Sequence, residues 1–98
     1  MKLTFEWDEI KEQANFKKHK VRFEEGKTIF SDPFLFTFPD NEHTENEERH
    51  INIGTSAKER ILILIHTERK GIIRIISCRK ATAIERRFYE EGGFYRYI

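Results

Sequence analysis

The pattern of hydrophobic and polar positions predicts strands in the middle of the chain. Phe34–Phe38 and Arg49–Ile53 alternate between the two kinds of residue, which is typical of a strand with one face toward a core. Arg60–His66 contains a run of consecutive aliphatic residues and predicts a central strand covered on both sides. A short turn at residues 69–71 then predicts a hairpin connection into a β-branched strand over Ile72–Cys78.

Helical signals come before these strands. After a short strand over Phe5–Trp7, Asp8 is a good N-cap for a helix that runs to about His19. This helix is strongly charged, and we expect its few apolar residues, Ile10, Ala14 and Phe16, to face the core. Apolar residues at helical spacing predict a second, short helix over Phe23–Phe30.

A third helix is predicted at the end of the chain, over Ala81–Glu91. Thr82 and Glu85 have the spacing of a capping box at its start, and Gly92 follows its last turn. The order of elements is therefore one strand, two helices, a four-strand meander and a final helix. This order predicts a single α+β domain over residues 1–98, with a small antiparallel sheet and helices packed on it.

Composition narrows the class of protein. No apolar run approaches the roughly 20 residues of a membrane-spanning helix, and the first residues do not lead into a signal-peptide core. The single cysteine, Cys78, excludes an internal disulfide framework and a cysteine-based metal cluster. We therefore expect a cytoplasmic protein with no membrane association.

Charge is distributed unevenly along the chain. Residues 1–48 carry seven Lys and Arg against twelve Asp and Glu, a net −5, whereas residues 49–98 carry eleven against five, a net +6. This polarity suggests a face for a phosphate backbone or an acidic partner, although folding can also mix the two halves. Four arginines on the meander or at its ends would form a cationic cleft suited to a phosphorane transition state: Arg49, Arg60, Arg74 and Arg79.

The basic residues at the end of the first helix have two explanations. Residues 17–20 read Lys-Lys-His-Lys, and cations at a helix C-terminus interact favourably with the helix dipole. Alternatively, Lys18 or His19 faces a phosphate, and His19 titrates near neutrality as an acid or base.

Arg74 interrupts an isoleucine-rich strand and also has two explanations. A mid-strand arginine needs water, a ligand or an internal ion pair, because burying it unpaired is costly. Strict alternation places Ile72, Ile76 and Cys78 on its face, and Arg79 on the opposite face. Because Arg79 stands at the exit of the strand, it is the better candidate for binding a ligand.

Other kinds of site find little support in the sequence. The acidic segment is expected to be a solvated loop and not a metal site, because nothing fixes a coordination geometry for Asp40, Glu42, His43, Glu45, Glu47, Glu48 and His50. Ser56 and Ser77 lie in no hydrolase-type elbow, and the sequence has no glycine-rich phosphate loop. We therefore expect neither a metal ion nor another cofactor.

Several short segments between residues 5 and 89 follow one another in the order of a known family's motifs. The first two are Phe5-Glu6-Trp7-Asp8 and Asn15-x-x-Lys18-His19-x-Val21-x-Phe23-Glu24-Glu25. The later ones are Arg49 before Ile53-Gly54, Arg60 entering an aliphatic strand, Arg74-Ile75-Ile76-Ser77-x-Arg79-x-Ala81, Glu85-Arg86 and Tyr89. Together these segments resemble the BrnT toxins of bacterial type II toxin–antitoxin systems.

The resemblance implies a fold, an activity and a partner. The fold would be like that of RelE, a small antiparallel sheet with helices, in agreement with the pattern of elements. The activity would be that of a metal-independent endoribonuclease that inhibits translation. The partner would be a BrnA-like antitoxin with a ribbon-helix-helix DNA-binding part, through which alone the toxin would contact operator DNA.

A metal-free ribonuclease must deprotonate a 2′-hydroxyl, stabilise the charged phosphorane and protonate the leaving 5′-oxygen. Under the resemblance, Arg60 and Arg79 are expected to clamp the phosphate and the transition state. Lys18 or His19 is the candidate for the acid–base role.

Further roles are assigned on the same basis. Glu59 is a second candidate for the base, and Tyr89 is a candidate for base stacking or for the acid role. The remaining contacts to RNA are expected from Arg49, Arg74, Lys80 and Arg86.

A second class of function stays open from the sequence. The chain has no compact catalytic motif, so the same basic surface would also serve a non-catalytic module that binds protein or nucleic acid. An alanine substitution separates the two classes: loss of RNA cleavage with RNA binding retained requires chemistry, whereas loss of both indicates binding alone.

Overall fold

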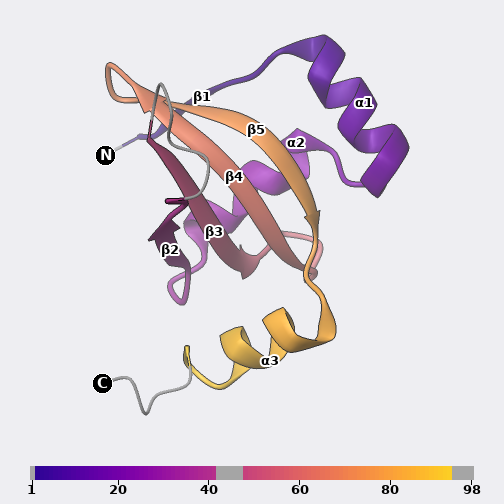
Figure 1. Ribbon diagram of the computed structural model, residues 1–98, viewed down its shortest axis with the longest axis vertical. Helices are drawn as coiled ribbons and strands as arrows, with labels where there is room; N and C mark the ends of the chain where they lie inside the picture. The colour runs from indigo at the N-terminus through magenta and orange to yellow at the C-terminus, as the bar shows by residue number, and fades with distance from the viewer. Residues whose placement is uncertain (1, 42–47, 94–98) are drawn as a thin grey trace.

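A five-stranded sheet forms the centre of the protein in the computed structural model, which describes residues 2–41 and 48–93 (Figure 1). The strand order is β1-β5-β4-β3-β2. The strands are β1 Thr4–Glu6, β2 Phe36–Pro39, β3 Arg49–Thr55, β4 Ile61–Arg69 and β5 Ile72–Lys80. The helices are α1 Glu9–His19, α2 Phe23–Gly26 with its 3₁₀ continuation η1 Lys27–Ser31, and α3 Ala83–Glu90.

The sheet is mixed, which corrects the prediction of an antiparallel one. β2 to β5 form the predicted antiparallel meander, and Lys70 and Gly71 have positive φ in the tight turn that joins β4 to β5. β1, however, pairs in parallel with β5, with Glu6 opposite Arg74. This pairing joins segments far apart in the chain, and no local pattern in the sequence specifies its direction.

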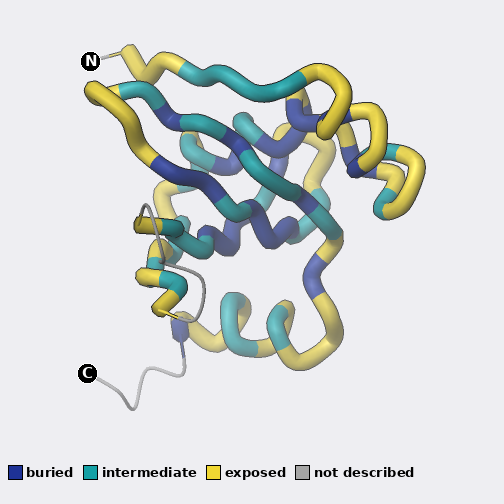
Figure 2. Tube along the Cα trace, turned by 45° about the horizontal axis from the view of Figure 1, so that its top comes forward, coloured by how far each residue is buried: buried dark blue, intermediate teal, exposed yellow. Residues whose placement is uncertain are grey.

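Two apolar layers cover the two faces of the sheet. On one face, α2 and η1 pack against the strands, and the buried residues are Val21, Phe23, Ile29, Leu62, Leu64, Ile73, Ile75 and Cys78. On the other face, Phe88 and Tyr89 of α3 pack near Ile53, Ile63 and Ala81. The centre of the aliphatic run of β4, residues 62–64, is therefore buried from both sides, as predicted, whereas Ile61 and Ile65 at its ends are half-buried. Figure 2 shows this concentration of buried residues in the central strands, whereas α3 has none.

Helix α1 has the predicted bounds but not the predicted inward face. Asp8 caps its start by accepting the N–H groups of residues 10 and 11. Ile10 is 79% exposed and Ala14 is exposed, so the expectation that they face inward is wrong; Phe16 is half-buried. Glu12 and Asn15 are buried instead. The reason is that α1 docks on β5 and α2 through hydrogen bonds and not through an apolar stripe.

The second predicted strand begins two residues later than expected. Phe34 is 72% exposed, and its N–H donates to the Asp32 carboxylate in a turn, so Phe34 does not share a strand face with Phe36 and Phe38. The predicted loop that follows includes residues 42–47, which lie outside the described residues. The aromatic tail from residue 94 also lies outside them.

A β-bulge in β5 reverses the predicted alternation after residue 76. Ser77 lies opposite Ile65, and Ile75 lies opposite His66, which leaves Ile76 as an extra residue. Cys78 consequently lies in the core with Ile75, and Arg79 lies on the same face as Arg74. The prediction that Cys78 shares the face of Arg74 is therefore wrong, because sequence alternation does not reveal a bulge.

Helix α3 begins with the predicted capping box. The Thr82 hydroxyl accepts the N–H of Glu85, and the Glu85 carboxylate accepts the N–H of Thr82. In the parts of the chain that the structure describes, no helix has the length and apolar character needed to cross a bilayer.

Candidate functional site

The last turn of α1 and the bulged part of β5 enclose an open cavity of about 280 Å³. Lys18 and His19 come from α1, and Ser77 comes from β5 just after the bulge. The remaining lining residues are Lys11, Ala14, Asn15 and Ile76. Two of the predicted catalytic residues therefore share one solvent-accessible cavity.

Asn15 fixes the position of this cavity. Its side-chain amide donates to the carbonyl oxygens of Cys78 at 2.8 Å and Val21 at 3.2 Å, and its Oδ1 accepts the N–H of Cys78 at 3.1 Å. The Asn15 side chain thus pairs with the backbone N–H and C=O of Cys78 in β5, as a neighbouring strand would. No role was predicted for Asn15, although its i+3 and i+4 spacing to Lys18 and His19 places all three on one side of the helix.

The electrostatic environment keeps His19 neutral. Partial burial lowers the pKa of the His19 imidazole below its usual value near 6.5, and the nearby positive charges of Lys18 and Arg79 lower it further. Most His19 side chains are therefore uncharged at pH 7 and have a lone pair available to accept a proton. Arg79 contributes to this shift through its charge, although it is not among the described residues that line the cavity.

Arg79 is held by a carboxylate from the start of α3. Its Nη1 and Nη2 donate to the two oxygens of Glu85 at 2.7 and 2.9 Å. The hydrogen bonds from Arg79, and then that from the Thr82 N–H, hold the pKa of Glu85 at about 2 despite its partial burial. Glu85 was predicted as a capping residue, whereas its second role, orienting Arg79, depends on the fold.

Arg60 has a different environment at the start of β4. Its guanidinium forms a bidentate ion pair with Glu25 of α2, and the Ser56 hydroxyl donates to the same carboxylate at 2.7 Å. The Glu25 side chain is only 4% exposed, and the hydrogen bond from Arg60 lowers its pKa. Glu59 is exposed in the preceding turn with a φ of 62°. The catalytic roles predicted for Arg60 and Glu59 stay predictions.

Tyr89 lies in a third hydrogen-bond network. Its hydroxyl donates to the Asp32 carboxylate and accepts a hydrogen bond from the Thr55 hydroxyl at 3.0 Å. Burial and the hydrogen bond to Asp32 raise the pKa of the Tyr89 hydroxyl. Tyr89 therefore links α3 to the segment before β2 and to the end of β3, and its predicted role in stacking or proton transfer stays a prediction.

The residues predicted to bind RNA are spread over both faces of the sheet and helix α3. Arg49 and Arg74 lie on either side of Thr67 across three neighbouring strands, and Arg74 pairs with Glu6 at 3.0 Å. Lys80 at the end of β5 and Arg86 on α3 are exposed. The structure thus brings Lys18 and His19 close to Arg79 and places the other candidates elsewhere.

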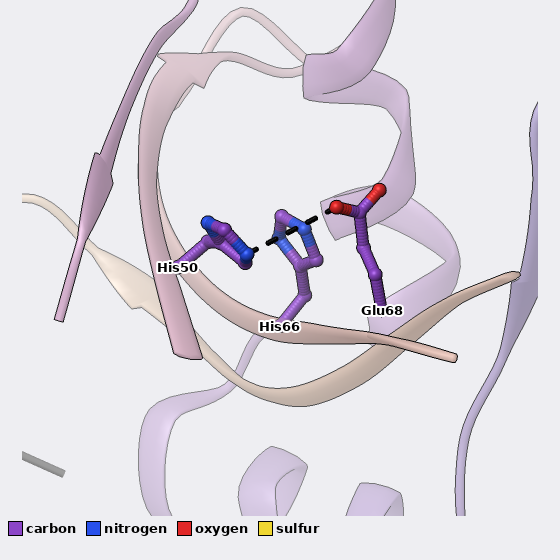
Figure 3. Close-up of side chains that lie close together, drawn as sticks. All are labelled: His50, His66 and Glu68. Carbon is purple, nitrogen blue, oxygen red and sulfur yellow. Dashed lines mark ion pairs between the residues drawn. The ribbon is translucent and has the colours of Figure 1, made fainter. Parts of the chain in front are cut away.

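A cluster that the sequence did not predict lies on β3 and β4 (Figure 3). His50 lies opposite His66 in the strand register, and Glu68 follows two residues later on the same face. One nitrogen of each imidazole and a Glu68 oxygen lie within 4.8 Å of one another. The His-x-Glu spacing on a strand is the signal that would have indicated part of this cluster.

Hydrogen bonding makes this cluster a poor metal site. The Asn52 side-chain nitrogen donates one hydrogen bond to the Leu64 carbonyl at 3.0 Å. The same nitrogen lies 2.7 Å from Nδ1 of His66 and has a second N–H to donate to it. Nδ1 must accept, and the proton of the neutral imidazole therefore lies on Nε2, where it blocks the lone pair that a metal would need. Burial and the charge of His50 lower the pKa of His66 to about 4 and keep it neutral.

Comparison with known proteins identifies the family. A family model described as the ribonuclease toxin BrnT of type II toxin–antitoxin systems matches residues 7–85. The chain belongs to the BrnT family. The match includes Lys18, His19, Arg79 and Glu85, and it ends before Phe88 and Tyr89 of α3.

A solved BrnT structure is also similar. The crystal structure of the ribonuclease toxin BrnT from Brucella abortus is 26% identical, with a TM-score of 0.64. The alignment covers 83% of this chain and 99% of that one. No curated protein matches the chain. The BrnT assignment therefore rests on the family model and on this structure, and a type II toxin of this family implies an antitoxin partner and an RNA substrate.

Proposed function

We propose that this BrnT family member is an endoribonuclease that cleaves RNA by metal-independent acid–base chemistry at Lys18, His19 and Arg79. The observation that carries the proposal is the cavity shared by Lys18 and His19, where partial burial, and then the charges of Lys18 and Arg79, lower the pKa of His19. A neutral imidazole beside fixed positive charge is a suitable base next to a phosphodiester.

The reaction begins when Nδ1 or Nε2 of neutral His19 takes the proton of the ribose 2′-hydroxyl. The 2′-oxygen then attacks the adjacent phosphorus, and a phosphorane with an additional negative charge forms. The bond from phosphorus to the 5′-oxygen breaks, and that oxygen takes a proton from Lys18 or from the protonated His19. The products are a 2′,3′-cyclic phosphate and a free 5′-hydroxyl, so atoms and protons balance without an added cofactor.

Positive charge stabilises the phosphorane in this proposal. Lys18 contributes an ammonium at the cavity. Arg79 contributes a guanidinium whose orientation is fixed by its two hydrogen bonds to Glu85. Asn15 keeps the last turn of α1 against β5 and acts as a positioning residue. Arg49, Arg74, Lys80 and Arg86 are the proposed contacts to the RNA backbone away from the cavity.

The biological setting of the proposal follows from the family. The toxin inhibits translation in the cytoplasm by cutting RNA through a RelE-like mechanism, and a BrnA-like antitoxin with a ribbon-helix-helix part neutralises it. Operator DNA is contacted only through that antitoxin. The family description of a type II ribonuclease toxin supports this setting.

The test is cleavage of end-labelled RNA by the purified protein in excess EDTA. We expect cleavage to persist in EDTA and to fall by about 100-fold or more in His19→Asn, because a positioned base contributes at least that factor. Lys17→Ala, an exposed neighbour on the same helix that does not line the cavity, is the matched control and should retain wild-type activity.

The pH profile supplies a second readout. Because the pKa of His19 is lowered, the base form is already dominant at pH 7, and the cleavage rate should fall as the pH drops through a value below 6.5. RNA that binds to the protein without being cut, with or without ribosomes, would contradict the proposal and favour the non-catalytic module.

A further inference from the structure

The sheet face that α3 packs against is apolar, and the described residues cover only part of it. The side chains that point away from α2 and η1 include Phe36, Phe38, Ile51, Ile53, Ile61, Ile63 and Ile65. Helix α3 covers one end of this face, where the Phe88 ring lies 5.3 Å from the Phe36 ring and 5.6 Å from the Phe38 ring. A sheet face of this composition normally packs against another layer.

Between α3 and this face lies an open groove of about 440 Å³. Its lining residues are Phe38, Ile51, Ile53, Ile63, Ile84, Glu85 and Phe88. Ile84 at the start of α3 is 77% exposed and extends the apolar lining of the groove to its solvent-facing edge. The volume lies within the range of roughly 300–1,000 Å³ typical of specific binding pockets.

The chemistry of the groove favours a protein occupant over RNA. Among the described lining residues the sole charged one is Glu85, whose charge is paired with that of Arg79, so this lining offers a phosphate no positive charge of its own. Positive charge beside the groove comes from Arg49, which precedes Ile51 by two residues on the same strand face. A suitable occupant therefore carries apolar side chains flanked by acidic ones.

We propose that this groove is the docking site for the antitoxin, through a segment with apolar anchor residues and acidic neighbours. The proposal rests on the antitoxin partnership given under the proposed function and adds the surface where the partner binds. Phe88 lines the groove on the side of α3 and lies outside residues 7–85, the part of the chain that the family model matches. The groove is also distinct from the cavity at His19, which has none of the same lining residues.

The experiment compares two isoleucines that differ mainly in their location. Ile84 is 77% exposed and Ile10 is 79% exposed, and each is the second residue of its helix. An aspartate at this position interacts favourably with the helix dipole, so both Ile84→Asp and Ile10→Asp should fold. The probe is the purified antitoxin encoded next to this toxin, and its affinity for each variant is measured by calorimetry, with RNA cleavage measured in parallel.

We expect Ile84→Asp to weaken antitoxin binding at least 10-fold and to retain RNA cleavage, while Ile10→Asp behaves like the wild type in both assays. Unchanged binding by Ile84→Asp, or equal weakening by both variants, would overturn the proposal. Loss of RNA cleavage by Ile84→Asp with antitoxin binding intact would assign the groove to the substrate and would also overturn it.

The two proposals can fail separately. A wild-type protein that cuts no RNA, but loses the antitoxin on Ile84→Asp, would refute the proposed chemistry and support the docking site. A wild-type protein that cuts RNA, but whose antitoxin binds Ile84→Asp normally, would do the reverse. Failure of the wild type to bind the antitoxin at all would overturn the docking site whatever the outcome of the cleavage assay.

Discussion

Two bidentate arginine–glutamate pairs lie at the same end of neighbouring strands and have different surroundings. Arg60 at the start of β4 binds Glu25, whose side chain is 4% exposed and also accepts the Ser56 hydroxyl. Arg79 near the end of β5 binds Glu85, whose side chain is 31% exposed and lies at the start of α3. The first pair joins a buried helix to the sheet, whereas the second orients a guanidinium near a cavity.

The comparison shows that burial of the carboxylate decides what its arginine does. A buried carboxylate left without its partner is costly, so Arg60 is required to keep Glu25 paired. A half-exposed carboxylate is stabilised by water when it is unpaired, so Arg79 contributes little to stability and its charge remains available to a ligand. In the sequence the two arginines look equivalent, since both occur at the ends of aliphatic strands.

The largest expected effect is on stability. Arg60→Ala should lower the free energy of unfolding by about 3–5 kcal/mol, because it leaves the buried Glu25 carboxylate unpaired. Arg79→Ala should lower it by no more than about 1 kcal/mol, as is usual for a partly exposed pair. Urea unfolding followed by circular dichroism measures both. Equal losses in the two variants would remove the distinction between the pairs.

The next effect is on catalysis. Arg79→Ala should reduce RNA cleavage by about 100-fold at unchanged fold, because removal of one preorganised charge at a transition state typically costs this much. Growth arrest on expression of the toxin should be relieved accordingly, and Arg79→Lys should restore part of the cleavage rate. Full toxicity of a stably expressed Arg79→Ala variant would show that the exposed pair is structural as well.

The smallest effect is a pH dependence of stability. The pKa of Glu85 is lowered to about 2 in the folded protein, so its contribution is complete above the unfolded value near 4.3 and is lost as the pH falls toward 2. Wild type should exceed Glu85→Gln by less than about 1 kcal/mol at pH 7, because glutamine keeps the helix cap. Unfolding midpoints from pH 7 to pH 2 should converge, and a constant gap would contradict the assignment.

Local patterns predicted those parts of the fold that depend on local interactions. The capping box at Thr82 and Glu85, the N-cap at Asp8 and the hairpin turn at Gly71 were all confirmed, because each depends on residues within one turn. The parallel pairing of β1 and the bulge at Ile76 were missed. Both depend on which distant strand lies alongside, and alternation in the sequence carries no such information.

The residue types of the candidate site were predicted, but which of those residues lie together was not. Lys18 or His19 was predicted for the acid–base role and Arg60 and Arg79 for the phosphate, yet the position of α1 against β5 depends on Asn15. Asn15 was not recognised because a polar residue in a charged helix normally faces solvent. The groove between α3 and the sheet was not predicted either, since it forms only where Ile84 and Phe88 meet strands that are distant in the chain.

The contact between Asn15 and Cys78 spans 63 positions of the chain, and it has a consequence for synthesis. On the ribosome, Lys18 and His19 emerge long before Arg79, and the cavity cannot close until the strand that carries Arg79 has left the exit tunnel. At about 5–20 residues per second this interval lasts several seconds. A chain that is interrupted before β5 is complete therefore lacks the assembled cavity, and under the proposed function such an unfinished copy would not cut the RNA around the ribosome that made it.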